Sequence, residues 1–366
     1  MREMRLDVPF VPEEGAGEDY HALLRELAGA GRLGSVHVAL QQPGLPDARV
    51  LPWHGPRHGP AGLYADGLDA AGTARALGAL PGVHAYILAN ARFHTASIYN
   101  DPQALLAALR AEGAEAFSGI VFADALLLHA LAAADSGLCA RFEAVPSVNC
   151  RLKTPAELDA LLLAVECAGF RPPSMLVPDR ELNRDLRALE RFSEHARARL
   201  PGVRVVLLAN EGCLAHCPFR LAHEAVIAHA RHGGDQEPFA LVRDRGCLRA
   251  FMVEPWRLLA SPFIRPEDAH RYEGLADGIK VCGRTRGAAF LARAVRAYAE
   301  GRWEGNLLEL MDTQEALCRR VHVDNAALPG DYHATVTACT GHCTACGACE
   351  AMAEAALGML PAAPEG

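Results

Sequence analysis

The chain has 366 residues, of which 51% are hydrophobic, and a formal net charge of −8 at pH 7. This size and composition argue against a disordered chain and suit one large domain with a small addition. The charge gives no overall attraction to nucleic acid or to an anionic membrane. Because the sequence contains no run of eighteen apolar residues and Met1–Phe10 lacks an apolar leader, we expect a cytoplasmic protein without membrane insertion.

Short apolar, β-branched runs alternate with segments of helical period along the first 300 residues. This alternation predicts parallel strands joined by crossover helices. The predicted strands are 35–40, 83–88, 119–122, 144–148, 174–177, 203–208, 248–253 or 256–261, and 277–281. The predicted helices are 20–30, 70–80, 102–112, 124–134, 154–167, 181–199, 218–231 and 287–300. Eight such units favour a TIM-like (β/α)8 barrel of the α/β class, closed or nearly closed.

Composition divides the chain into three parts. Residues 1–310 form the predicted barrel domain, 311–357 a small C-terminal cysteine-rich extension, and 358–366 a disordered tail. The extension is too small to fold on apolar burial alone, so we expect bound metal to help it hold its shape. The densest basic stretch, 180–199, is interleaved with acidic residues, a pattern that favours a solvated helix face.

Four of the twelve cysteines fall within eleven residues near the C-terminus: Cys339, Cys343, Cys346 and Cys349. This spacing resembles the ferredoxin-type run, in which short loops let successive thiolates reach the corners of one cluster. Zinc is the alternative, but structural zinc sites usually use two short pairs separated by a longer stretch. The spacing therefore favours an iron-sulfur cluster.

A second group of cysteines lies around the predicted barrel mouth, where the active sites of such barrels are found. Cys213 and Cys217 follow the strand 203–208, at the start of a helix whose dipole favours thiolate. Cys247 precedes the seventh predicted strand in a loop that could fold over the same mouth, and Cys282 directly follows the eighth. These positions predict a group of thiols around the mouth.

Three arginines are candidates for binding a substrate carboxylate, because a guanidinium offers a planar fork that matches this group: Arg220, Arg265 and Arg284. The alternative is that each pairs with a structural acid, such as Glu267 or Asp268. His223 could relay protons, although a core or capping role is an equal alternative. Asn210 and Glu211, at a strand end, could orient substrate or simply form a turn.

The second half of the chain carries four motifs in a characteristic order: Asn-Glu-Gly-Cys-Leu-x-x-Cys-Pro-Phe-Arg-x-x-His (210–223), Ser-Pro-Phe-Ile-Arg-Pro-Glu-Asp (261–268), Ile-Lys-x-x-Gly-Arg-Thr (279–285) and Gly-Asn-Leu-Leu-Glu-Leu (305–310). Together they resemble the collagenase-like U-thirty-two peptidase family. The first third of the chain matches this family only in general pattern.

The resemblance implies a barrel-like domain with an oxygen-sensitive four-iron cluster held by cysteines. Relatives in this family act in oxygen-independent hydroxylation of ubiquinone precursors, tRNA and rRNA, with oxygen taken from a donor such as prephenate. Cys213, Cys217 and Cys247 match the family's first three ligands. The fourth position, near 268–270, holds no cysteine here, so we predict Cys282, with Cys150 or a C-terminal cysteine as alternatives.

The resulting hypothesis is an iron-sulfur oxidoreductase with one or two 4Fe-4S clusters that hydroxylates, or otherwise modifies by redox chemistry, a small aromatic or nucleobase substrate. The predicted catalytic residues are Glu211, His223 and Arg284. Asn210, Arg220 and Arg265 are the predicted substrate-binding residues. The predicted metal ligands are Cys213, Cys217, Cys247, Cys282, Cys339, Cys343, Cys346 and Cys349. The barrel cluster would bind or activate the oxygen donor, and the C-terminal cluster would relay electrons.

Two alternatives remain. The chain could be a non-catalytic iron-sulfur subunit that forms a heterodimer with another family member, or it could be a collagenase-like peptidase. The sequence contains no His-Glu-x-x-His, because Ile227 stands where the second histidine would be, and no Gly-x-Ser-x-Gly. His54 and His58 lie in a Gly/Pro-rich loop without a suitably spaced carboxylate.

Overall fold

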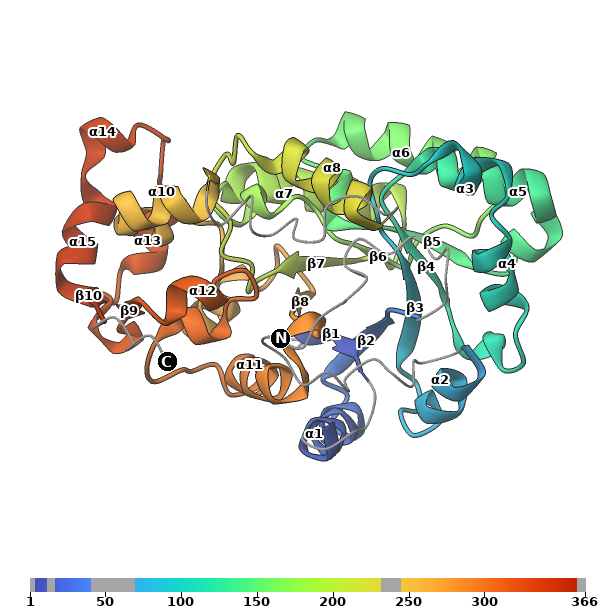
Figure 1. Ribbon diagram of the computed structural model, residues 1–366, viewed down its shortest axis with the longest axis horizontal. Helices are drawn as coiled ribbons and strands as arrows, with labels where there is room; N and C mark the ends of the chain where they lie inside the picture. The colour runs from blue at the N-terminus through green and yellow to red at the C-terminus, as the bar shows by residue number, and fades with distance from the viewer. Residues whose placement is uncertain (1–3, 12–16, 41–69, 232–244, 361–366) are drawn as a thin grey trace.

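The computed structural model describes residues 4–11, 17–40, 70–231 and 245–360. At its centre lies a sheet of eight parallel strands surrounded by helices (Figure 1). The strands are β1 (Arg5–Phe10), β2 (Leu33–Val38), β3 (His84–Ala89), β4 (Gly119–Phe122), β5 (Glu143–Pro146), β6 (Met175–Leu176), β7 (Arg204–Leu208) and β8 (Gly278–Lys280). Their order across the sheet is β5-β4-β3-β2-β1-β8-β7-β6.

The two edge strands, β5 and β6, approach each other and nearly close the sheet. A parallel bridge pairs Glu143 of β5 with Arg171, just before β6. The backbone N–H of Arg171 donates to the Phe142 carbonyl at 2.9 Å. The molecule is therefore a nearly closed TIM-like (β/α)8 barrel, which confirms the fold class predicted from the sequence.

Seven of the eight predicted strands are present, but the remaining one was assigned to the wrong segment. The run 248–253 lies in a helix, α10 (Cys247–Val253), and 256–258 in a 3-10 helix, η4 (Pro255–Leu258). The missing strand is β1, which pairs with both β2 and β8. Cys247 therefore begins a helix and does not precede a strand.

The helices around the barrel are α1 (Gly17–Gly29), α2 (Ala70–Leu77), α3 (Ala96–Asn100), α4 (Gln103–Arg110), α5 (Ala125–Cys139), α6 (Pro155–Cys167), α7 (Leu186–Arg199), α8 (Arg220–Arg231), α10 and α11 (Ala288–Glu300). The capping box that the sequence indicates at Thr154 is present: its hydroxyl accepts from Glu157 N at 3.3 Å, and the Glu157 carboxylate accepts from Thr154 N at 2.9 Å. Among the described residues, each helix is too short or too polar to span a bilayer.

The barrel interior contains an apolar layer and a polar layer. The apolar layer consists of Tyr86, Leu88, Val121, Val145, Met175, Val177, Val206 and Leu208. In the polar layer, the fully buried Asp7 carboxylate accepts two hydrogen bonds from the Arg204 guanidinium, at 2.8 and 3.1 Å, and one from the Ser35 hydroxyl at 2.5 Å. Together these bonds join β1, β2 and β7, so they hold the scaffold beneath the mouth.

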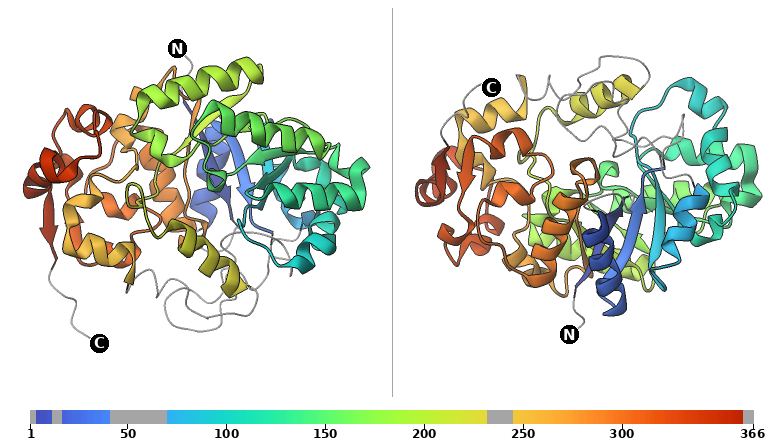
Figure 2. Two further views of the ribbon diagram at one scale, coloured as in Figure 1. Left: turned by 90° about the horizontal axis from the view of Figure 1, so that it is seen from above. Right: turned by 60° about the horizontal axis from the view of Figure 1, so that its bottom comes forward.

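The C-terminal extension lies at one end of the molecule in both Figure 1 and Figure 2. It contains α12 (Glu315–Cys318), β9 (Val321–Val323), α13 (Tyr332–Thr337), α14 (Cys343–Cys346), α15 (Ala348–Ala356) and β10 (Leu357–Met359), with β9 and β10 antiparallel. Leu317 and Tyr332 are buried in the same apolar core as the barrel helices, so the extension shares that core. Gly358 and Met359 lie in a strand where the sequence predicts a disordered tail, and 361–366 lie outside the described residues.

Candidate metal centre at the barrel mouth

Asn210 fixes the loop after β7 at the C-terminal mouth of the barrel. Its Nδ2 donates to the carbonyls of Cys282, at 2.8 Å, and Leu310, at 3.0 Å. Its Oδ1 accepts from Cys282 N at 2.7 Å and from the Cys282 thiol at 3.2 Å. The amide that we predicted to contact substrate is thus fully buried and joins the ends of β7 and β8.

Arg180 is the central cation of the mouth. It lies in the 3-10 helix η3 (Arg180–Asn183) after β6, forms an ion pair with Glu211 and places Nη1 3.4 Å from Cys213 Sγ. Burial disfavours its charge, but Glu211 and Cys213 outweigh burial and raise its pKa. The solvated helix face predicted for this stretch is wrong at Arg180, because η3 begins at the strand end and Arg180 is buried.

Cys247 lies within electrostatic reach of two other predicted thiols, Cys213 and Cys217. Burial, followed by the charge of Glu211, raises the pKa of Cys213 to about 12, and Cys247 contributes to this rise. Burial, followed by the charge of Cys217, raises the pKa of Cys247 to about 11. A negative charge on one thiolate therefore disfavours the loss of a proton from a neighbouring thiol, as expected where thiols share a site without a metal cation.

The donor set fits an iron-sulfur cluster in its chemistry. Soft thiolates are the ligands of such clusters, and binding removes the protons that burial and mutual repulsion otherwise retain. Within the described ranges, no three His, Cys, Asp or Glu side chains already converge closely enough to hold a metal ion. The structure thus gathers Cys213, Cys217 and Cys247 in one region without placing their sulfur atoms in a coordination geometry.

Cys282 has different neighbours. It is half-buried, contacts the apolar layer inside the barrel, and donates its thiol hydrogen to Asn210. Asn210 begins the loop that carries Cys213 and Cys217, so Cys282 lies beside the same loop. Cys150, the alternative ligand, donates to the Phe122 carbonyl at 3.4 Å, and burial raises its pKa to about 12.

The raised pKa of Cys213 predicts slow alkylation in metal-free protein. At pH 8 a thiol with a pKa near 12 is almost entirely protonated, and only the thiolate reacts. We expect Cys213 to react with iodoacetamide at least about a hundredfold more slowly than Cys167, which is exposed on α6. Timed alkylation followed by peptide mass spectrometry measures both rates, and equal rates would contradict this description of the site.

The predicted substrate-binding arginines pair with acidic side chains of the fold. Arg220 Nη1 lies 2.9 Å from Asp179 Oδ2. Arg265 is buried, and its Nε lies 2.7 Å from Asp268 Oδ2. Its guanidinium carbon lies 4.7 Å from the centre of the Tyr332 ring. Arg265 thus pairs with a structural acid, as the alternative to substrate binding predicts. Arg284 begins the 3-10 helix η6 (Arg284–Arg286) directly after β8 and is half-buried there. His223 is half-buried on α8.

Sequence reasoning missed a group of charged residues at the mouth. Arg92 follows β3 and Arg151 follows β5, and both contact Glu224 of α8, at 3.6 and 3.3 Å. Burial raises the pKa of Glu224 although Arg151 and Arg92 act against the rise. Both arginines follow predicted strands, and this position could have indicated that they lie at the mouth. Neither arginine belongs to one of the motifs, so neither was predicted as a site residue.

Lys280 is the last residue of β8 and belongs to the motif at 279–285. It is buried, and its register partners are Asp7 on β1 and Leu208 on β7. Burial lowers its pKa to about 8, with Asp7 acting in the opposite direction. The barrel thus holds, at the end of β8, an amine that loses its proton more readily than an exposed lysine does.

The four C-terminal cysteines lie on α14, on α15 and just before them. Cys339 and Cys346 are exposed, whereas Cys343 and Cys349 are half-buried. Burial raises the pKa of Cys349 to about 11, and the charges of Cys339, Cys343 and Cys346 add to the rise. Cys349 therefore lies within electrostatic reach of the other three thiols. Helix α15 packs against η4, and η4 packs against α10, which begins at Cys247. The C-terminal cysteines are therefore linked through η4 to the helix that bears Cys247.

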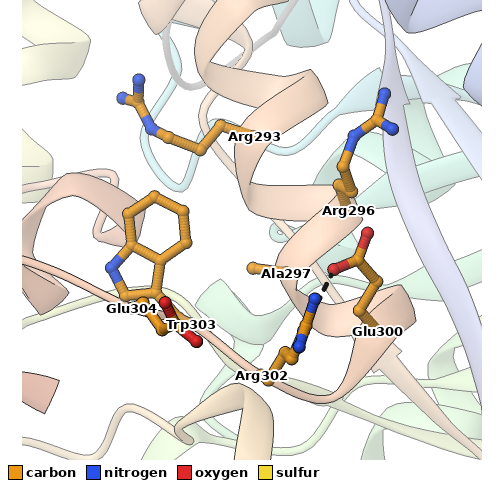
Figure 3. A pocket seen from close by; sticks show the side chains of 7 residues that line it. All are labelled: Arg293, Arg296, Ala297, Glu300, Arg302, Trp303 and Glu304. Atoms are coloured by element: carbon orange, nitrogen blue, oxygen red, sulfur yellow. Dashed lines mark ion pairs between the residues drawn. The ribbon is translucent and has the colours of Figure 1, made fainter. Parts of the chain in front are cut away.

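A cavity of about 250 Å³ lies elsewhere, at the C-terminal end of α11 (Figure 3). It is lined by Arg293, Arg296, Ala297, Glu300, Arg302, Trp303 and Glu304, and Arg302 pairs with Glu300 at 3.6 Å. A helix that follows a barrel strand runs back toward the strand N-termini, so this cavity lies at the end opposite the mouth. It is separate from the candidate site. His54 and His58 lie outside the described residues.

No family model matches the chain. The chain is similar to a protein of Methanocaldococcus jannaschii named as an uncharacterized protease, with 32% identity over 182 residues. The matched segment covers 49% of this chain and 52% of the relative, so the chain spans about half the length of this curated relative.

Proposed function

We propose that this chain is an iron-sulfur enzyme of the U-thirty-two type, in which Cys213, Cys217, Cys247 and Cys282 hold a 4Fe-4S cluster at the barrel mouth. The observation that carries the proposal is the buried Arg180, which contacts both Glu211 and Cys213 beside the other thiols. A guanidinium in this position would offset the negative charge of a cluster with thiolate ligands. The motifs at 210–223 and 279–285, together with the partial similarity to the archaeal protein, support the family assignment.

The residues around this site have distinct roles in the proposal. Asn210 orients the loop that bears Cys213 and Cys217, and Arg180 pairs with Glu211 beside it. Glu211, His223 and Arg284 remain the proposed catalytic groups. An iron-sulfur cluster, when bound, supplies electron transfer or activation of an oxygen donor. A second cluster on Cys339, Cys343, Cys346 and Cys349 would serve as an electron relay.

The reaction that we propose is oxygen-independent hydroxylation, or a related redox modification, of an aromatic or nucleobase substrate. A carboxylate-bearing oxygen donor, such as prephenate, suits a mouth where Arg92 and Arg151 converge. The reaction class rests on the family resemblance, and the charged mouth supports the carboxylate.

Anaerobic purification followed by iron, sulfide and zinc analysis tests this proposal. We expect iron and sulfide in equal amounts, with at least four of each per chain. Cys213→Ser is expected to remove about four irons, whereas Cys167→Ser, at an exposed position on α6, should leave the content unchanged. A colourless protein that contains stoichiometric zinc would be incompatible with the proposal.

Peptidase activity is a second candidate, supported by the name of the archaeal relative. Incubation of the purified chain with gelatin and with casein, with and without added divalent metal, tests it directly. Cleavage that persists in the Cys213→Ser variant would favour the peptidase, because the proposed redox chemistry requires that thiol.

A further inference from the structure

Two arginines from different strand ends converge on one carboxylate. Arg92 approaches Glu224 Oε2 through Nε at 3.6 Å, and Arg151 approaches the same oxygen through Nη2 at 3.3 Å. Arg92 is held in place, because its Nη1 donates to the Asn149 carbonyl at 2.5 Å. Asn149 Nδ2 in turn donates to the Asn90 carbonyl at 3.2 Å. Both guanidiniums therefore stand on short loops fixed by the barrel.

Glu224 fits this pair poorly. Charge-assisted hydrogen bonds between a guanidinium and a carboxylate are usually 2.7–2.9 Å long, and both contacts here are longer. Within the part of the chain that the structure describes, Arg151 Nε is buried and has no acceptor. Nε and Nη2 form the edge of a guanidinium that binds a carboxylate with two parallel hydrogen bonds. Glu224 thus engages only half of that edge.

We propose that Arg92 and Arg151 form a binding site for the carboxylate of a small organic acid, and that Glu224 of α8 fills this site until the acid displaces it. An incoming carboxylate can use both Arg151 Nε and Nη2, which Glu224 does not. Arg180 and Arg220 also lie within electrostatic reach of Glu224, and they are themselves paired with Glu211 and Asp179. The inference deepens the proposed function, on which it rests for the identity of the acid, but binding of a carboxylate at these arginines needs no cluster.

Calorimetric titration of the full chain with malonate, at measured iron content, tests the site. Glu224→Gln removes the competing charge while keeping the side-chain shape. If Glu224 occupies the site most of the time, this variant should bind malonate about tenfold more tightly than the wild type. Adding Arg151→Met to Glu224→Gln should abolish the gain. Arg191→Met, on the exposed face of α7, is the matched control and should change nothing.

Three results would overturn the inference. In the first, Glu224→Gln binds malonate no more tightly than the wild type. In the second, the double variant with Arg151→Met keeps the gain. In the third, inorganic phosphate binds as tightly as malonate, because the site would then not select a planar carboxylate. If Glu224→Gln does not fold, the malonate-induced rise in Tm of the wild type should still be lost in Arg151→Lys, and an unchanged rise would contradict the site. Malonate binding by iron-free chain would leave this inference intact even if the proposed cluster failed.

Discussion

Arg180→Met is expected to lower the free energy of unfolding of the metal-free chain by about 3–5 kcal/mol, because it leaves a buried carboxylate without its cation. The Arg180 and Glu211 side chains are only 6% and 9% exposed, so water cannot replace the lost partner. Cys213 loses its guanidinium neighbour as well. We therefore also expect a lower iron content after anaerobic purification. Urea denaturation and iron analysis measure the two effects.

Two variants make this test specific. Arg180→Lys keeps a positive charge but cannot contact Glu211 and Cys213 with one planar group, so an intermediate loss is expected. Arg187→Met, at an exposed position on α7, should change stability by less than about 0.5 kcal/mol. If Arg180→Met retained the stability and iron of the wild type, Arg180 could not be the central cation of the mouth.

Asp7→Ala is expected to destabilise the barrel by a similar amount, about 3–5 kcal/mol. The fully buried carboxylate accepts from the Arg204 guanidinium and from Ser35, so its removal leaves the partly buried charge of Arg204 without this partner. Replacing both members of the pair, in Asp7→Ala/Arg204→Met, should recover part of the loss because the Arg204 charge is then removed together with its partner. Urea denaturation measures each variant.

The contrasting case is an ion pair on the surface. Glu166 and Arg199 approach to 3.0 Å but are 47% and 43% exposed, so Glu166→Gln should cost less than about 1 kcal/mol. An Asp7→Ala variant as stable as Glu166→Gln, or a double variant no more stable than Asp7→Ala alone, would show that the polar layer does not hold the barrel together.

The barrel was predictable because most strands are short apolar runs between helical segments, but β1 shows where this pattern fails. Leu6, Val8 and Phe10 alternate as a strand requires and are buried. Their neighbour Asp7 points into the barrel, where a hydrophobic residue is expected. Its partner Arg204 is 197 residues away in the chain, so no local pattern could reveal that this acid is paired in the interior.

The strand predicted at 248–253 was wrong because its apolar pattern is ambiguous. A short apolar run fits a buried strand and a half-buried helix equally well, and periodicity over seven residues cannot separate them. The structure forms α10, which buries Phe251 against the core. Cys247, expected in a loop before this segment, begins α10 instead, and its charge contributes to the raised pKa of Cys213.

The candidate site could be predicted as far as its cysteines, because their spacing and motif carry the signal. Its charged residues could not, since each arginine's role depends on a partner from another element. Arg220 and Arg265 suited a substrate carboxylate but pair with Asp179 and Asp268. Arg180, in contrast, was interpreted as a surface residue and is buried beside Cys213.

Anaerobic Mössbauer spectroscopy on iron-57-labelled protein tests the central claim most directly. A variant with serine at 339, 343, 346 and 349 should keep the four-iron signal of the barrel cluster. Adding Cys213→Ser to that variant should abolish the remaining signal. A cluster spectrum that is unaffected by Cys213→Ser, or one that disappears completely when only the four C-terminal cysteines are replaced, would contradict a cluster at the mouth of the barrel.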